Sequence, residues 1–273
     1  MHQYFPASDA PFGAEVFERV QQTVLGVMKS QLAGRRLLEV EGPYGLGHKS
    51  FGGADRDLEE TTEVAGAVAR LKVATAIPLP MIECTFTLGV REVAAFLEHQ
   101  APFSLDPAVR AAMAVARAED AVVFWGSEAA GLKGLLNMPG VQSRDLESWE
   151  ELGSPVEDMI RAVGMLEQRG FLGPYALALS PARYDLLYRR YQEAAMLQIQ
   201  HVEQIVTGGV IKAPGLGNVG GVLVAAGAPF ASIVLGQDAQ VGFVGPHAAG
   251  YELVILESLA TRVQVPEAVA VLK

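Results

Sequence analysis

The sequence predicts an α+β fold with two compact parts and one long exposed excursion. Residues 81–88 alternate between apolar and polar side chains, which is typical of a half-buried strand. An alanine-rich segment after Pro107 has the spacing of a long helix. Between them, residues 48–73 combine paired glycines with a run of charges and show no core-forming period, so this segment is expected to be exposed.

The composition suits a protein that buries surface against copies of itself. Of 273 residues, 50% are hydrophobic and 19% are charged, and the formal net charge is −10. An acidic chain disfavours non-specific nucleic-acid binding, so no nucleic-acid partner is expected. The single cysteine cannot form an internal disulfide, which favours a reducing cytoplasmic location.

Two segments of the chain bear on targeting and membrane insertion. The N-terminus, residues 1–6, lacks a basic region followed by an apolar core, so no secretory signal is expected. Residues 213–237 carry no formal charge, but their many glycines and prolines favour short buried strands joined by turns. The sequence therefore predicts a soluble protein without a membrane span.

The first elements follow from apolar spacing. Phe17, Val20, Val24 and Met28 recur at helical intervals, which predicts a helix over about residues 14–33 with Gly34 as its C-terminal cap. The stretch 40–45, Val-Glu-Gly-Pro-Tyr-Gly, cannot continue a helix and predicts a sharp turn without catalytic groups.

The central elements are a strand and a long helix. In residues 81–88, Ile82, Cys84, Phe86 and Leu88 are expected to share one face of the strand. The long helix is predicted to begin with Asp106 as its N-cap and Pro107 at the first helical position, and to continue through Phe124.

A second compact part is predicted from about residue 144. Residues 154–157, Ser-Pro-Val-Glu, match a capping box and predict a helix that stops before Gly170. A second helix is expected after Ser180, carrying a tyrosine stripe at positions 184, 188 and 191 that favours packing. The predicted strands are 175–179, 210–211, 222–224, 233–235, 253–256 and 269–272.

The pattern Gly-Leu-Gly-Asn-Val-Gly at Gly215–Gly220 matches the glycine spacing of dinucleotide-binding proteins. That mechanism requires a helix to start at the glycines, so that its amides hold the pyrophosphate. Here Pro214 precedes the pattern and a β-branched run follows it. A glycine-rich turn between two strands is therefore the favoured interpretation, and a nucleotide-dependent enzyme is the alternative.

No other catalytic or metal-binding motif is present. The five histidines are far apart in sequence, and none belongs to a metal-binding helix motif. Cys84 lies on the apolar face of its strand, where a small packed side chain is the favoured interpretation over a nucleophile. We therefore expect no enzyme activity, no cofactor and no metal site.

Seven short motifs in a fixed order give the chain a family resemblance. They are Gly34-Arg35-Arg36, the turn 40–45, Phe86-Thr87-Leu88, residues 131–136, residues 173–177, residues 235–238 and Pro266-Glu267-Ala268. This ordered set, from about Phe17 to the C-terminus, resembles the encapsulins, the nanocompartment shell proteins once described as linocin-type bacteriocins. The resemblance implies a Hong Kong 97-type phage capsid fold with a peripheral domain, an axial domain and an extended loop.

The resemblance also implies a division of the chain. The peripheral domain would comprise residues 1–47, 74–143 and 236–273, with the N-terminal helix and a spine helix. Residues 48–73 would form the extended loop, and residues 144–235 the axial domain. Members of the family close into icosahedral shells, and this chain length is similar to that of the smallest class, with about sixty copies.

By the same resemblance, the shell encloses a cargo enzyme that docks through its C-terminal peptide. The cargo is commonly a dye-decolourising peroxidase or a ferritin-like iron oxidase, which links the family to oxidative stress and iron storage. The matching groove residues are Met28, Leu32, Arg35 and Glu39, facing Val241 and Phe243. The alternative is that these residues only hold the N-terminal helix to its own domain.

A pore is implied where the axial domains meet. The matching loop is Glu193, Ala194, Ala195, Met196 and Leu197, whose lining is apolar except for Glu193. Such a pore would select small solutes by size more than by charge. A phage-derived capsid protein that packages DNA is a further alternative, disfavoured because no basic interior tail is visible.

Overall fold

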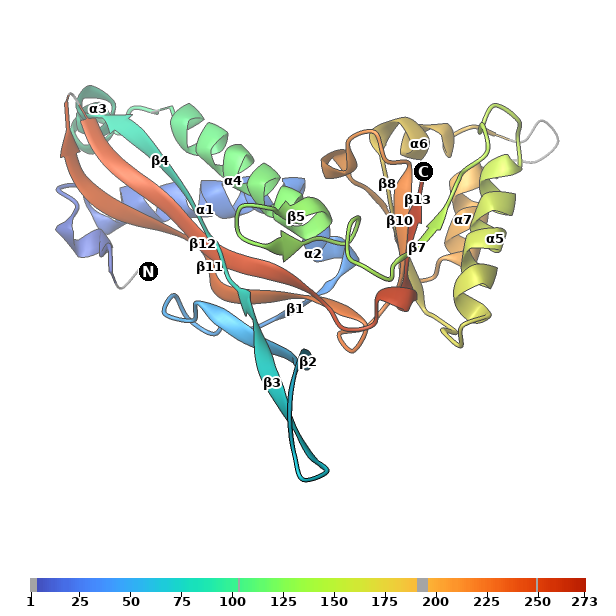
Figure 1. Cartoon of the computed structure of the whole chain (residues 1–273). Coiled ribbons are helices and arrows are strands. Elements are labelled where there is room, and N and C mark those ends of the chain that lie inside the picture. The colour runs from blue at the N-terminus through green and yellow to red at the C-terminus, as the bar shows by residue number, and fades with distance from the viewer. Residues whose placement is uncertain (1–3, 103, 191–195, 249) are drawn as a thin grey trace.

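Two β-sheets and one projecting hairpin form the frame of the molecule (Figure 1). The computed structural model describes residues 4–102, 104–190, 196–248 and 250–273. The helices are α1 (Ala14–Gln31), α2 (Gly34–Leu37), α3 (Val90–His99), α4 (Asp106–Trp125), α5 (Ser154–Glu167), α6 (Pro181–Leu186) and α7 (Gln198–Ile205). Short 3₁₀ turns are η1 (Ala7–Asp9), η2 (Pro214–Leu216) and η3 (Pro266–Ala268).

The first sheet carries the two long helices α1 and α4. Its strand order is β1 (Glu39–Glu41), β11 (Ala231–His247), β12 (Gly250–Val263) and β4 (Met81–Gly89). β1 is parallel to β11, and the other pairs are antiparallel. The buried stripe of α1 packs with α4 and the inner face of the sheet, because its apolar residues recur once per helical turn.

The second sheet lies beside the first and is covered by α5 and α7. Its strand order is β7 (Gln142–Arg144), β13 (Val269–Leu272), β10 (Gly221–Ala225), β8 (Tyr175–Leu179) and β9 (Val210–Lys212). Strands β8, β10 and β13 are buried along their whole length, as their continuous apolar sequences predict. A small antiparallel pair, β5 (Gly126–Ser127) and β6 (Leu132–Lys133), follows α4.

One hydrophobic cluster joins the two sheets. Phe124, at the end of α4, belongs to the same buried cluster as Ile233 of β11 and Val222 of β10. Gly215 approaches this helix so closely that a Cβ there would lie 3.1 Å from the Phe124 ring. The two parts therefore share buried apolar packing where they meet.

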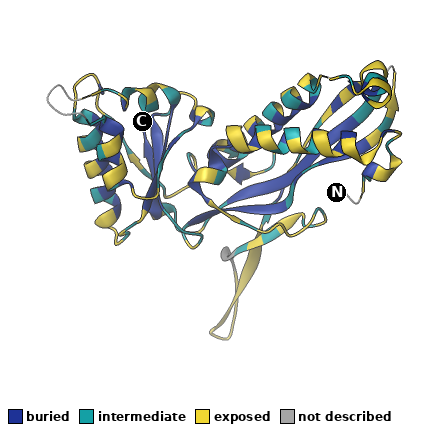
Figure 2. Cartoon of the chain, turned by 180° about the vertical axis from the view of Figure 1, so that it is seen from behind, coloured by how far each residue is buried: buried dark blue, intermediate teal, exposed yellow. Residues whose placement is uncertain are grey.

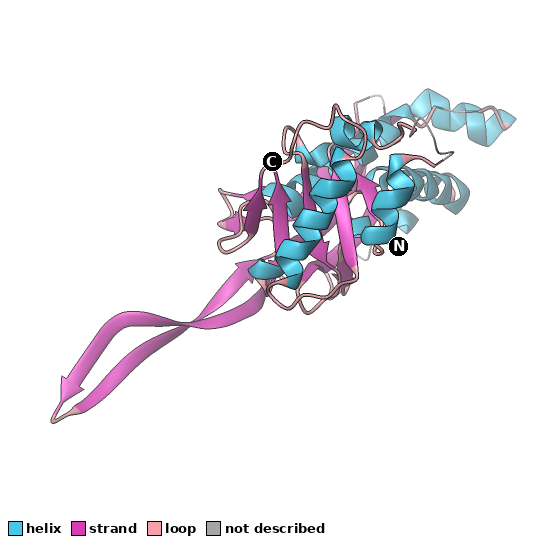
Figure 3. Cartoon of the chain, turned by 90° about the vertical axis from the view of Figure 1, so that its right-hand side faces the viewer, coloured by secondary structure: helices cyan, strands magenta, loops and turns pink. Residues whose placement is uncertain are grey.

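The predicted excursion is a two-stranded ribbon. β2 (Ser50–Val64) and β3 (Ala67–Pro78) pair antiparallel and project from the body of the molecule (Figure 3). Every described side chain from residue 61 to residue 76 is exposed (Figure 2). Exposure was predicted correctly, but the range 48–73 omitted the last residues of the second strand. Residues 74–76 are exposed and residues 77–78 are half-buried, so no alternation of buried and exposed positions marks them as part of a strand.

The turn at residues 40–45 attaches β1 to the edge of β11. Gly42 and Gly45 have φ values of 109° and 103°, which a residue with a side chain rarely adopts. The Tyr44 amide donates to the Leu235 carbonyl at 3.0 Å, and the Gly45 amide donates to the Gly236 carbonyl. The sharp turn that the sequence predicted is confirmed.

Two predicted helix ends differ in the N-terminal half. Gly34 does not cap α1, which ends at Gln31; it is the first residue of α2. The Ala33 and Gly34 amides both donate to the Asp120 carboxylate, a distant partner that starts a new helical turn there. In α4, Leu105 is the N-cap, so Asp106 and Pro107 each lie one position further into the helix than predicted.

Two further predictions fail in the C-terminal half. Ser154 does not form a capping box, because Gly153 is the N-cap and the Ser154 hydroxyl donates back to the Glu151 carbonyl at 2.8 Å. The tyrosine helix is shorter than predicted and ends at Leu186. Tyr184 and Tyr188 contact each other with hydroxyl oxygens 3.2 Å apart, whereas Tyr191 lies outside the described residues.

The boundary at residue 236 does not separate the two sheets. Residues 231–235 already belong to β11 and pair with β1 or β12 of the first sheet. Strand β13, at the C-terminus, pairs with β10 and β7 of the second sheet. The chain therefore crosses between the two parts once more than the predicted ranges 144–235 and 236–273 allow.

We predict that Phe124→Ala lowers the free energy of unfolding by about 3–5 kcal/mol, because it leaves a cavity in the cluster shared by both sheets. Urea unfolding followed by tryptophan fluorescence measures the change. The matched control is Val122→Ala, which truncates a half-buried side chain two residues earlier on the same helix and should cost about 1 kcal/mol. Equal costs for the two variants would contradict the shared cluster.

Candidate functional site

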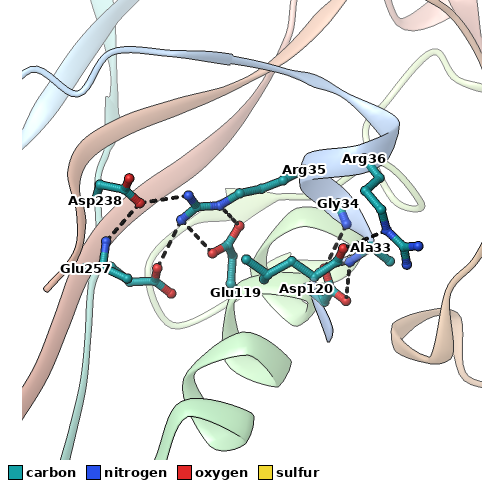
Figure 4. Close-up of polar contacts among 10 residues, drawn as sticks. Ala33, Gly34, Arg35, Arg36, Glu119, Asp120, Asp238 and Glu257 are labelled. Atoms are coloured by element: carbon teal, nitrogen blue, oxygen red, sulfur yellow. Dashed lines mark hydrogen bonds and ion pairs between the residues drawn. The ribbon is translucent and has the colours of Figure 1, made fainter. Parts of the chain in front are cut away.

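Arg35 is the centre of a buried ion cluster beside the N-terminal helix (Figure 4). Its Nε donates to Glu119 Oε1 at 2.7 Å, and one terminal nitrogen donates to Asp238 Oδ1 at 2.7 Å. The other terminal nitrogen donates to Glu119 Oε2 at 2.9 Å and to Glu257 Oε2 at 3.2 Å. The guanidinium of α2 therefore joins α4, β11 and β12 at one point.

Three carboxyl groups around one guanidinium cannot all remain charged at low cost. Glu119 and Glu257 are fully buried, whereas Asp238 is about half exposed. Burial, reinforced by the negative charge of Glu119, raises the pKa of Glu257 to about 9 despite the opposing charge of Arg35. Burial lowers the pKa of Arg35, but hydrogen bonds and charges from Glu119 and Asp238 outweigh it and raise that pKa. At neutral pH, Glu257 is the protonated member.

Asp120, the next residue on α4, fixes the start of α2. Its carboxylate accepts the amides of Ala33 at 3.1 Å and Gly34 at 2.8 Å. Burial raises the pKa of Asp120, although these two amides favour its charged form. Consecutive acids on α4 thus have two tasks: Asp120 holds the backbone that precedes Arg35, and Glu119 holds its side chain.

Two adjacent cavities form a groove between α1 and β11. The first has a volume of about 260 Å³ and is lined by Leu25, Met28, Lys29, Leu32, Arg35, Arg36, Asp238 and Ala239. The second, of about 440 Å³, is lined by Ala7, Ala14, Phe17, Glu18, Gln21, Leu25, Asp238, Ala239 and Gln240. Leu25, Asp238 and Ala239 belong to both, so the Arg35 cluster forms part of the wall where the cavities meet.

The structure brings together part of the predicted docking set. Met28, Leu32 and Arg35 line the first cavity, with Met28 and Leu32 only 2% and 4% exposed. Val241 and Phe243 are buried in the core that supports the groove. Glu39 lies on β1 opposite Ser232, and it is absent from the described residues that line either cavity.

Most of the predicted pore loop lies outside the described residues. This is the case for Glu193, Ala194 and Ala195. Met196 and Leu197 are half-buried, and the Leu197 amide donates to Gln200 Oε1 at 2.9 Å at the start of α7. The pore therefore stays a prediction from the sequence resemblance.

The glycine pattern at 215–220 is a turn between strands, as the sequence favoured. A 3₁₀ turn, η2, covers its start, and β10 begins at Gly221. No helix begins at these glycines, all of which lie within the described residues, so the amide cradle that pyrophosphate binding needs is not formed. Within the same described part of the chain, no group of three or more His, Cys, Asp or Glu side chains is placed so that it could hold a metal ion.

Sequence reasoning missed Glu119, Asp120 and Glu257. Each interrupts an apolar segment. Glu119 and Asp120 lie on the buried face of α4, and Glu257 lies within the buried run of β12. Acids are rarely fully buried unless they are paired. An acid inside an otherwise apolar helix face or strand is therefore the signal that could have found them, although their common partner is visible only in the fold.

A family model described as "Encapsulating protein for peroxidase" matches residues 2–260. The chain belongs to the encapsulin shell-protein family. It is 28% identical over 283 residues to the type 1 encapsulin shell protein of Myxococcus xanthus, covering 100% of this chain and 97% of that protein. It is 30% identical to the type 1 encapsulin shell protein of Rhodospirillum rubrum, covering 97% and 94% of the two chains.

Solved structures extend the likeness of this encapsulin to phage capsids. The virus-like particle from Pyrococcus furiosus matches with a TM-score of 0.74 at 21% identity, over 95% of this chain and 100% of that one. The capsid of Myoviridae phage XM1 matches with a TM-score of 0.54 at 13% identity, over 88% and 89%. At these identities the likeness shows the fold, and the predicted Hong Kong 97-type capsid fold is confirmed.

Membership in this family makes the encapsulin a structural shell protein and not an enzyme. The nucleotide-dependent enzyme that the glycine pattern suggested is therefore wrong, consistent with the strand that follows Gly220. Of the helices that the structure describes, none has the length and apolarity needed to cross a membrane.

We predict that Glu257→Gln removes part of the loss of stability that accompanies a rise in pH. Because the folded-state pKa of about 9 lies above the unfolded value, this carboxyl group lowers stability as pH rises from about 5 to 9. In that window its contribution falls by about 1 kcal/mol per pH unit, and glutamine, which cannot ionise, lacks it.

Urea unfolding at pH 6, 7.5 and 9 measures this effect. The midpoint of the original chain should fall more steeply with pH than that of Glu257→Gln, whereas Glu128→Gln, at an exposed position, should follow the original chain. Parallel curves for the original chain and Glu257→Gln would show that Glu257 is not a buried protonated group.

Proposed function

We propose that the encapsulin assembles through its ribbon into a closed icosahedral shell, with about sixty copies as the size that its length favours. The observation that carries the proposal is the exposure of the β2–β3 ribbon. Val64, Val68, Leu71 and Val73 are 68%, 52%, 51% and 45% exposed. Among the described residues, β2 and β3 pair with each other and with no third strand.

A two-stranded ribbon with apolar side chains needs a partner. Isolated hairpins are marginally stable in water, and open strand edges attract further pairing. The family match to shell proteins and the capsid fold support a second copy of the chain as that partner. A shell of many copies would bury these edges and side chains together. We place this shell in the cytoplasm, in line with the single unpaired cysteine.

We propose further that the groove beside α1 receives the C-terminal peptide of a cargo enzyme inside this shell. The groove is lined by apolar side chains of α1 and by the Arg35 cluster, which suits an extended segment with apolar anchors. The family description names a peroxidase as the enclosed protein, which supports a peroxidase as one cargo class. A ferritin-like oxidase, implied by the family resemblance, is the other.

We predict that Leu71→Glu prevents assembly, because it places a charge on the exposed ribbon surface that a neighbouring copy would cover. Size-exclusion chromatography with light scattering and negative-stain microscopy should show megadalton particles for the original chain and small species for the variant. Since Leu71 is exposed in the single chain, the fold of the subunit should persist. Leu71→Ile is the matched control and should assemble normally. Particle formation by Leu71→Glu would count against the ribbon contact.

We predict that Leu25→Glu leaves assembly intact and lowers cargo loading at least tenfold, because Leu25 lies where the two cavities meet. Quantitative mass spectrometry of purified particles, expressed in the native host, measures the second protein per shell. Gln22→Glu adds the same charge on an exposed position of α1 and should load normally. Unchanged loading in Leu25→Glu would place the docking site elsewhere.

A further inference from the structure

The two cavities of the groove beside α1 differ in charge, although the chain as a whole is acidic. Its first cavity is lined by Lys29 and Arg36, and its second cavity by Glu18. Arg35 and Asp238 also line the groove, but both belong to the Arg35 cluster, in which Glu119 adds a further negative charge. With a formal net charge of −10 over the whole chain, two cations at one end of one groove are a local exception.

Neither cation forms a close ion pair with a carboxylate of the described residues, although the charge of Arg36 favours the ionised form of the nearby Asp120 carboxyl group. Arg36 donates to the carbonyl oxygens of Leu32 at 3.0 Å and Lys212 at 3.4 Å, which carry no formal charge. Among the ion pairs of the described residues, none includes Lys29 or Arg36. Both lie near the C-terminal end of α1, whose dipole supplies only about half a negative charge. The lining of the first cavity, with Lys29, Arg35 and Arg36 against Asp238, therefore carries more positive than negative charge.

The edge of β11 along the groove is closed to strand addition. Three successive outward amides already donate within the chain: Ala239 to Asp238 Oδ1 at 2.9 Å, Val241 to Gln21 Oε1 at 2.9 Å, and Phe243 to the Phe5 carbonyl at 3.2 Å. A bound peptide cannot gain affinity from these amides without displacing their partners. Its affinity must come from side chains in the cavities and from charge.

We propose that Lys29 and Arg36 bind the free α-carboxylate of the docked cargo peptide. This inference rests on the proposed docking function and gives the peptide a direction: its last residue lies in the first cavity, and the preceding residues pass Leu25 toward Glu18. A guanidinium and an ammonium together suit the two oxygens of one carboxylate. The first cavity is also the smaller one, as befits the place where a chain ends.

Cargo loading in co-expressing cells tests the inference. A fluorescent protein carries a C-terminal tag with one leucine for each of the two cavities and glycine and serine between them (Gly-Ser-Leu-Gly-Ser-Leu-Gly). A second version continues the tag with ten further glycine and serine residues. A third version has aspartate in place of the last tag residue, before the same extension. Fluorescence per purified particle reports loading, and an untagged fluorescent protein gives the background.

We expect the free-ended tag to load at least fivefold better than the extended tag. The double variant Lys29→Gln/Arg36→Gln should reduce this ratio below twofold, while Lys133→Gln, which removes an exposed cation outside the groove, should leave it unchanged. Lys29, Arg36 and Lys133 are all exposed, so these variants should still form particles. Microscopy can verify this.

The remaining outcomes are distinct. Equal loading of the free-ended and extended tags, still abolished by Leu25→Glu, would overturn the carboxylate site while docking in the groove survives. Loading restored fully by the aspartate version would assign the cations to an acidic side chain and overturn the terminal carboxylate. No loading above background for any tag would contradict docking in this groove, and the inference with it.

Discussion

The contact between Arg35 and its three carboxyl groups holds helices α2 and α4 against the first sheet. Through one guanidinium, α2 is attached to α4, β11 and β12, and the end of α1 is carried along with α2. Removing one partner of such a buried cluster leaves an unpaired charge, which typically costs 3–5 kcal/mol, about the same as the loss of a large core side chain. The position of the groove follows from this contact, since the cluster is part of its wall.

The elements that bury an apolar stripe were predictable, and those that depend on a distant partner were not. The α1 stripe, the alternating strand β4 and the apolar strands β8, β10 and β13 follow from local spacing. The start of α2 depends on Asp120, which is 86 residues away from Gly34 in sequence. Helices α3 and α7 were missed because short amphipathic helices carry few apolar repeats.

The candidate site shows the same division. Met28, Leu32 and Arg35 were found through ordered motifs, because those motifs preserve the neighbourhood of α1 and α2. Glu119 and Glu257 were missed because an acid in an apolar run gives no clue to its partner. Glu39 was expected in the groove, yet it follows α2 into β1, where strand pairing with β11 directs the chain away from the cavity. The ordered motifs thus identified the part of the chain that forms the groove, and tertiary contacts determined which of its side chains line the groove.

The ribbon β2–β3 distinguishes a free subunit from one whose surface is covered by neighbouring copies. A buried cluster joins the two sheets of the subunit. The ribbon extends beyond both sheets, and its apolar side chains and strand edges are exposed to water. If neighbouring copies cover it, the same surface that builds a shell also labels every subunit that has not yet joined one. Chaperones and proteases, which bind exposed apolar strands, would then distinguish surplus subunits from finished shells without any dedicated signal.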